Sequence, residues 1–223
     1  FEKTGLVHKN LVYLNSISAI YRLDDEVIEK GILNEPIYRS EPGFYIWSSL
    51  NRSGNTIIFL EYNPEGKSGK LILFDTVSMQ TVFTESLIVG SFLNQLLCVI
   101  GEKAYFLADG ILSACNISEK NVKKQKVDFE TDQGSFLIGN GNKLSLTSND
   151  GKIYFLDNAS GIFKFTGIVE HNVNSIAGFE GNLFLGTHEG WKYYNSNGIL
   201  VYRHEDIVEN KIEALSKNML VVS

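Results

Sequence analysis

The sequence predicts an all-β protein, a β-propeller of four-stranded blades with about five complete blades and a partial sixth. Two observations lead to this class. The 223 residues are 43% hydrophobic with 20 glycines and only three prolines, which suits short strands separated by glycine turns. A strand pair with its turn also recurs along the chain at spacings typical of propeller blades.

The clearest repeat matches residues 142–165 with residues 181–202, at an offset of 39 positions up to Tyr154 and Tyr193 and with two residues deleted after them. Apolar and turn positions coincide in one frame: Leu144 with Leu183, Leu146 with Leu185, Asp150-Gly151 with Glu189-Gly190, and Tyr154 with Tyr193. The stretch that follows each copy also matches at the same offset. This agreement predicts one structural unit repeated in register.

Within one unit the apolar residues alternate with polar ones, as in half-buried strands. Residues 143–147 and 152–157 are predicted strands, joined by the turn Asn149-Asp150-Gly151 of the Asp-Gly hairpin type. A third strand is predicted at 162–165 after the Ser160-Gly161 turn, and a fourth at 173–178.

Weaker copies of the strand that begins the repeat start at residues 11, 56, 104 and 218, in addition to the two clear copies at 143 and 182. We therefore expect a single propeller domain over residues 1–223, as a segment of a longer chain. The approximate blades are 5–36, 43–87, 90–129, 134–170, 173–209 and a partial blade at 211–223. A β-sandwich is the alternative, but it would not need one four-strand unit repeated in register.

The segment from Gly151 to Gly161 resembles the quinoprotein-like (PQQ-like) propeller repeat, with a glycine, an alternating strand, Leu-Asp, and a small residue before a second glycine. Residues 66–75 and 181–198 resemble weaker copies, and the latter is also similar to the propeller repeats of bacterial sensor proteins. The family usually closes each blade with a tryptophan, where this chain has Phe165 and Tyr202. The resemblance implies the non-enzymatic scaffold branch of the family, and no cofactor is expected.

The charge balance argues against nucleic acid as a partner. The chain has 26 acidic and 20 basic side chains, a net charge of −6, and only four arginines. Nucleic-acid binding needs a basic surface that displaces counterions. No apolar run approaches the length of a membrane span, so we expect none within this chain.

The sequence contains no motif that identifies a reaction. None of the four histidines has metal-ligand spacing, and neither a nucleophile elbow nor a dinucleotide fingerprint occurs. Acidic residues such as Asp128, Glu130 and Asp132 lie in connections, where solvated carboxylates are common. We therefore predict a non-catalytic protein that binds a protein partner, with no metal. Two alternatives are a ligand-sensing extracytoplasmic domain of a larger receptor and a propeller glycan hydrolase or lyase.

The predicted binding surface consists of blade turns, because loops on a rigid scaffold are natural contact sites. The turns are Asp24-Asp25, Asp109-Gly110, Asn149-Asp150-Gly151 and His188-Glu189-Gly190. In Trp191-Lys192-Tyr193-Tyr194, strand alternation places Tyr194 on the face opposite Trp191, and we expect Tyr194 to be available for contact.

Two further expectations concern the thiols and the last blade. Cys98 lies in an apolar run and Cys115 in a different strand, so both are predicted to be free thiols. The partial sixth blade would leave a strand edge open. We expect missing strands, or strands donated by the protein partner, to complete it, rather than residues 5–9 folding back.

Overall fold

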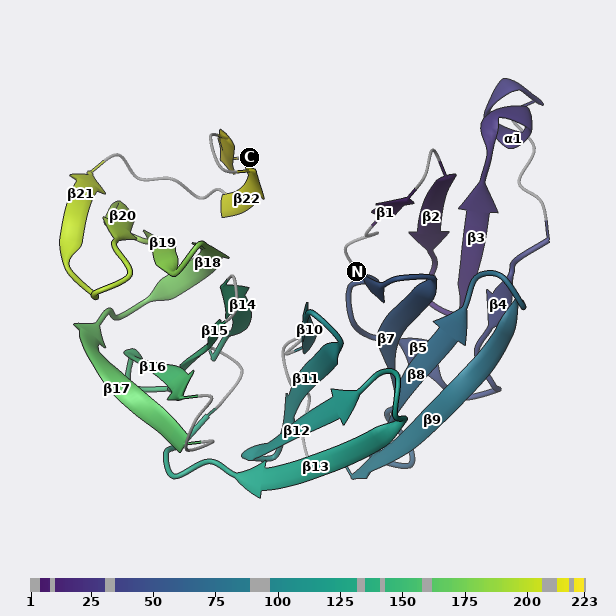
Figure 1. Cartoon of the computed structure of the whole chain (residues 1–223), viewed down its shortest axis with the longest axis horizontal. Helices are drawn as coiled ribbons and strands as arrows, with labels where there is room; N and C mark the ends of the chain where they lie inside the picture. The colour runs from purple at the N-terminus through teal and green to yellow at the C-terminus, as the bar shows by residue number, and fades with distance from the viewer. Residues whose placement is uncertain are drawn as a thin grey trace. The chain divides into compact units, whose positions relative to one another are not determined.

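The computed structural model describes residues 5–8, 11–30, 35–88, 97–131, 135–140, 143–157, 162–205, 212–216 and 219–222. These residues form 23 strands and one short helix, so the predicted all-β class is confirmed (Figure 1). By its internal contacts the chain divides into unit 1, residues 1–104 and 114–123, and unit 2, residues 105–113 and 124–223.

The first blade belongs to unit 1 and has four antiparallel strands in chain order. Its strands are β1 (Gly5–His8), β2 (Leu11–Asn15), β3 (Ala19–Leu23) and β4 (Tyr38–Arg39). The helix α1 (Asp25–Lys30) follows β3. It has six residues, so no helix in the described ranges could cross a bilayer. Because β1 pairs with β2, the N-terminal strand is part of its own blade, as predicted.

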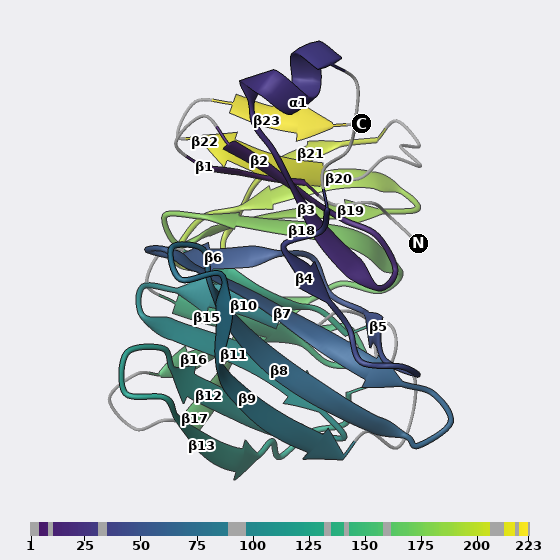
Figure 2. The ribbon, with the colours of Figure 1, turned by 90° about the vertical axis from the view of Figure 1, so that its right-hand side faces the viewer.

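The second blade contains the longest strands of unit 1. It is built from β5 (Tyr45–Ile46), β6 (Asn51–Ser53), β7 (Thr56–Asn63), β8 (Ser68–Asp75) and β9 (Gln80–Ile88). Both β5 and β6 pair with β7, at opposite ends of that strand, so the innermost position is shared by two short strands. Figure 2 shows β7, β8 and β9 side by side.

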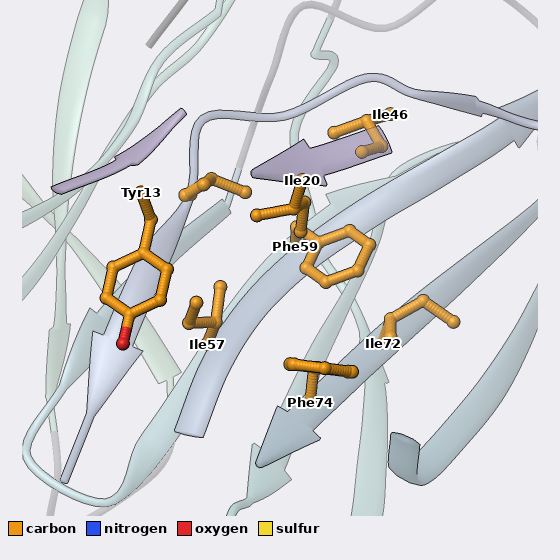
Figure 3. Close-up of a cluster of buried hydrophobic side chains, with 8 residues drawn as sticks. Tyr13, Ile20, Ile46, Ile57, Phe59, Ile72 and Phe74 are labelled. Atoms are coloured by element: carbon orange, nitrogen blue, oxygen red, sulfur yellow. The ribbon is translucent and has the colours of Figure 1, made fainter. Parts of the chain in front are cut away.

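A cluster of buried side chains holds these two blades of unit 1 together (Figure 3). The members labelled in the figure come from β2, β3, β5, β7 and β8: Tyr13, Ile20, Ile46, Ile57, Phe59, Ile72 and Phe74. Residues two apart in a strand share a face, so Ile57 and Phe59 point into the cluster together. Burial of each large apolar side chain contributes about 1.5–3 kcal/mol. Ile58 and Leu73, on the other face of the sheet, are also buried, so both faces of β7 and β8 are covered, and the cluster with the first blade covers one of them.

The third blade is a four-stranded sheet through which the division between the units runs. Its strands are β10 (Leu97–Ile100), β11 (Lys103–Ala108), β12 (Ile111–Asn116) and β13 (Asn121–Lys126). Phe106 and Leu112 on the middle strands are buried, whereas most of β13 is exposed and polar. Cys98 and Cys115 are buried free thiols on β10 and β12.

The fourth and fifth blades belong to unit 2 and repeat the same order of strands. The fourth has β14 (Leu137–Asn140), β15 (Lys143–Thr147), β16 (Lys152–Asp157) and β17 (Ile162–Val169). The fifth has β18 (Val173–Phe179), β19 (Asn182–Thr187), β20 (Gly190–Tyr194) and β21 (Leu200–His204). The Ser160-Gly161 turn lies outside the described residues.

The outer strand of the fourth blade is longer than the predicted 162–165. It continues to Val169 through a register shift opposite Lys152, with Gly167 at φ +87°. The hydroxyl of Thr166 donates to the carbonyl oxygen of Ile153 at 2.8 Å, and Ile168 is buried. The strand therefore continues beyond Gly167 through a β-bulge, although the glycine suggests from the sequence that the strand ends before it.

The last sheet has two strands, β22 (Ile212–Ser216) and β23 (Met219–Val222), as predicted for a partial sixth blade. Within unit 2, β18 lies beside both β14 and β22, so the first strands of successive blades are neighbours. Figure 1 shows these strands grouped on one side of unit 2, with the outer strands β17 and β21 on the other.

Candidate functional site

Five connections of unit 2 lie at the same end of its blades. They are residues 108–111, 127–131, 148–151, 170–172 and 187–190, which together we call the rim. Three backbone hydrogen bonds, each from an N–H to a carbonyl oxygen, join neighbouring connections: Val127 to Gly110 (2.9 Å), Asn149 to Glu130 (3.2 Å) and Glu170 to Gly151 (2.9 Å). These bonds join four of the five connections in a row, from residues 108–111 to residues 170–172.

The β15–β16 turn shows why this local sequence fits the rim. The buried Ser148 donates its N–H to the carbonyl oxygen of Lys152 at 2.9 Å, and its hydroxyl accepts the N–H of Lys152 at 3.1 Å and donates to Asp150. Asp150 forms an ion pair with Lys152, with 2.5 Å between Oδ2 and Nζ. Hydrogen bonds from Lys152 and then Ser148 lower the pKa of Asp150 to about 2. Asp150 is therefore charged at neutral pH.

An aromatic cluster stands next to this turn. The ring of Phe129, in the connection after β13, stacks on Tyr154 of β16 with centroids 3.9 Å apart and planes 5° apart. Phe163 of β17 meets Phe129 edge-on at 5.8 Å, and Phe165 contacts Tyr154 at 5.7 Å. Stacked and edge-on rings hold one another in place. The cluster therefore fixes the connection against the outer strand of the fourth blade.

Two hollows share the Phe129–Tyr154 ring pair as part of their lining, and we call them together the Phe129 site. The acidic hollow, of about 540 Å³, is lined by Asp128, Glu130, Asn149, Asp150 and Lys152 with the two rings. The second hollow, of about 380 Å³, has a mixed lining that consists of Val127, Ile162 and Phe163, the same two rings, and the polar Gln125, Lys126 and Asp128. We call it the apolar hollow after its exposed Ile162. Both hollows lie wholly within unit 2.

The acidic hollow carries a net negative charge. Asp128 and Glu130 are exposed, and the single lysine, Lys152, is already bonded to Asp150. The amide of Asn149 donates to Glu130 at 3.1 Å, which orients that carboxylate along the rim. Three carboxylates and one paired lysine favour a cationic ligand group.

A buried ion pair connects Glu170 of the rim, which follows the fourth blade, to Lys192 of the fifth blade. Glu170 accepts from Lys192 Nζ at 2.6 Å and from the hydroxyl of Tyr194. The side chains of Glu170 and Lys192 are only 11% and 12% exposed, and Glu189 approaches Lys192 at 3.8 Å. Burial, and secondly the hydrogen bond to Glu170, raise the pKa of Tyr194. This group is built to hold the rim rather than to meet a ligand.

The expectation that Tyr194 is available for contact is wrong. Tyr194 is 8% exposed and lies opposite Leu183, which is itself buried. Strand alternation correctly separates Tyr194 from Trp191 and Tyr193. It does not show that both faces of a middle blade strand are covered, because a neighbouring element packs on each face.

The buried carboxylates of the described residues are Glu61 and Glu170, one in each unit, and each is bonded to a tyrosine. In unit 1 the hydroxyl of Tyr38 donates to Glu61 at 2.7 Å, and its pKa is raised by burial first and then by this carboxylate. In the described part of the chain no group of three or more His, Cys, Asp or Glu side chains is arranged to hold a metal ion.

Some of the predicted turn residues come together and others do not. Asp109 and Asp150 belong to rim connections that hydrogen bonds join to the Phe129 site, whereas His188 and Glu189 form the exposed rim turn of the fifth blade. Asp24 and Asp25 belong to unit 1, and they lie at the end of β3 opposite the β2–β3 turn. Asp24 forms an ion pair with Arg22 at 3.9 Å. These two residues are therefore not topological equivalents of the other turns.

Sequence reasoning missed Phe129. It identified the neighbouring Asp128 and Glu130 only as solvated charges of a connection. The available signal was a large aromatic residue between two acids in a polar segment. Such a residue needs apolar cover from elsewhere in the chain, and Tyr154 and Phe163 supply it.

Comparison with known proteins tests the architecture. No family model matches the chain, and no curated protein matches it in sequence. Solved structures do match: BamB from Moraxella catarrhalis has a TM-score of 0.67 over 98% of this chain, at 14% identity. A chain of the mitotic checkpoint complex has a TM-score of 0.62 over 87% of this chain, at 15% identity. The fold is a β-propeller.

The two similar propellers are of different kinds, since BamB consists of PQQ-like repeats and the second is a WD40 propeller. The likeness therefore confirms the propeller of four-stranded blades, and the resemblance to the quinoprotein-like repeat stays a prediction. This chain spans 65% of the length of the BamB chain and 62% of the other.

Proposed function

We propose that this chain is a non-catalytic propeller that binds another protein, and that the Phe129 site on the rim of unit 2 is the centre of contact. The observation that carries the proposal is the stacked ring pair that lines both an acidic hollow and an apolar hollow. Well-packed aromatic anchors surrounded by polar groups are typical of protein interfaces.

The rim around the Phe129 site is held in place by the blades, and this favours a role in binding a protein. Hydrogen bonds join four of the five rim connections, and the ion pair between Glu170 of the rim and Lys192 of β20 links the fourth and fifth blades. A preorganised surface loses little conformational entropy on association. One of the similar propellers is part of a multiprotein complex, which agrees with a binding role, although fold alone does not assign function.

The proposal extends to the β22–β23 sheet. Among the described residues these two strands pair only with each other. An open strand edge binds an extended segment through backbone hydrogen bonds. We infer that further strands, from the partner or from elsewhere in the polypeptide, complete this sheet.

Site-specific photocrosslinking in the native cells tests the binding function. The photoreactive residue p-benzoylphenylalanine would replace Phe163 in the apolar hollow. In a matched control it would replace Asn197 in the exposed β20–β21 turn of the next blade, which lines neither hollow. We expect a defined protein adduct from position 163 and none from position 197. Phe129→Ala should reduce the adduct. The proposal fails if position 163 gives no protein adduct, or if both positions give the same set of adducts.

A further inference from the structure

We propose that the Phe129 site takes an extended protein segment in which a lysine or arginine lies within two residues of a bulky apolar side chain. The inference rests on the proposed function and names the chemistry of the partner. Its basis is the immediate contact between an apolar hollow and an acidic one.

The apolar hollow provides the seat for the bulky side chain. Ile162 is 56% exposed at its mouth, while Val127 is buried at 5% exposure. The rings of Phe163 and Phe129 meet edge-on there, so the surface is already ordered before a partner arrives. An apolar group that covers Ile162 and the rings removes exposed apolar surface from water.

The acidic hollow selects the charge of the partner. Asp128, Glu130 and Asp150 face one lysine, and that lysine is bonded to Asp150 at 2.5 Å. An ammonium or guanidinium group is complementary to this excess of carboxylates. The same excess, with the net charge of −6 of the whole chain, repels nucleic acid and anionic segments.

The lining that the two hollows share favours one short segment rather than two separate ligands. Both are lined by Asp128, Phe129 and Tyr154, so the same side chains separate them. In an extended chain, side chains two residues apart point the same way at a separation of roughly 7 Å. Lys126 borders the apolar hollow, so the cation of the segment is directed to the opposite, acidic side.

Three capped, fluorescein-labelled peptides test the pattern with the whole 223-residue chain. They are identical except for a central Leu-Ser-Arg, Leu-Ser-Glu or Ser-Ser-Arg. Fluorescence anisotropy at fixed ionic strength gives each Kd. We expect the Leu-Ser-Arg peptide to bind about tenfold more tightly than either of the other two.

Surface variants assign each half of the pattern to its hollow. D128N/E130Q should remove the preference for arginine over glutamate, whereas Ile162→Ser should remove the preference for leucine over serine. Glu180→Gln changes an exposed carboxylate in the β18–β19 turn, at the other end of the strands from the rim; it is the matched control and should leave all three Kd values unchanged. These positions are exposed, so loss of folding does not complicate the comparison.

The outcomes separate this inference from the proposed function. Equal affinity for the arginine and glutamate peptides, or an equal effect of Glu180→Gln, overturns the inference even when position 163 crosslinks to a protein. Equal binding of Ser-Ser-Arg and Leu-Ser-Arg overturns it as well, because the attraction is then charge alone. Absence of any protein crosslink at position 163 defeats the proposed function itself.

Discussion

Gly151 is the residue on which the rim depends most directly. Its φ of +79° lies in the left-handed region, and an added Cβ would stand 2.3 Å from the carbonyl oxygen of Glu170. Its own carbonyl oxygen accepts the N–H of Glu170 at 2.9 Å. The residue therefore combines a turn conformation with a close approach of two backbones.

Gly151→Ala should lower the free energy of unfolding by roughly 2–4 kcal/mol, because left-handed strain and a backbone clash add together. The matched control is Gly110→Ala in the corresponding turn of the third blade, where φ is +70° but the added Cβ meets open space. That change should cost about 1–2 kcal/mol. Urea denaturation measures both, and equal losses would show that the contact with Glu170 carries no strain.

The two cysteines give a prediction about reactivity. Burial raises the pKa of Cys98 to about 12, and burial with the nearby Glu85 raises the pKa of Cys115 to about 11. A raised pKa leaves little thiolate at pH 8, and the thiolate is the reactive form. Ellman's reagent should therefore label neither thiol in the native protein at pH 8 and both in urea. Rapid native labelling of either cysteine would contradict this assignment.

At the scale of elements, the Glu170–Lys192–Tyr194 group joins the end of β17 to β20. A buried carboxylate loses hydration, and here two donors at hydrogen-bond distance offset that loss. The link explains how the connection between the fourth and fifth blades stays fixed against the rim turn of Gly151.

Glu170→Gln should lower the free energy of unfolding by roughly 1–3 kcal/mol, since it leaves the largely buried Lys192 without its main partner. The control is Glu189→Gln, which removes an exposed carboxylate 3.8 Å from the same lysine. That change should stay within about 0.5 kcal/mol. Chemical denaturation of the two variants under one set of conditions measures both losses. Equal losses would show that the Glu170–Lys192 pair does not stabilise the fold more than an exposed contact does.

The same group predicts a loss of stability in alkaline solution. The pKa of Tyr194 is raised in the folded protein above its ordinary value near 10, so folding favours the protonated phenol. Its contribution is complete below pH 10 and is lost as the pH rises toward the folded pKa. Tyr194→Phe should make the free energy of unfolding fall less steeply between pH 9 and 11. An unchanged slope in urea titrations at these pH values would contradict the assignment.

At the scale of the whole molecule, four of the complete blades join their strands in chain order, the second blade has both β5 and β6 on β7, and the last sheet has only two strands. A strand inside a blade has both backbone edges paired, as β19 has with β18 and β20. Within the described ranges β23 pairs with β22 alone. Protection of the backbone should therefore differ between equivalent strands of successive blades.

Amide hydrogen exchange measures this difference. The amides of Met219–Val222 should exchange faster than the inward-bonded amides of Asn182–Thr187, because one edge of β23 has no strand beside it in the described structure. A partner that completes the sheet should slow exchange at Met219–Val222 and leave Asn182–Thr187 unchanged. Equal protection of both strands in the isolated chain would show that β23 is already paired on both sides.

The sequence by itself determined the repeating unit. Leu144 and Leu146 alternate with polar residues, and Asp150-Gly151 marks a turn, because strand faces and turn conformations depend on residues that are neighbours in the chain. The same local rules located the middle strands of each blade and the two-stranded last sheet. They also placed Asp150 in a turn, and this turn lines the acidic hollow of the Phe129 site.

Only the tertiary structure decided which side chains meet. Phe129 and Tyr154 are 25 positions apart and Glu170 and Tyr194 are 24 apart, and each contact joins segments from different strands or connections. Alternation assigned Tyr194 to a face, but the neighbouring elements packed against that face buried it. Periodicity within a strand records which side chains share a face, whereas burial and pairing depend on what packs against that face, and this is fixed only when the blades assemble.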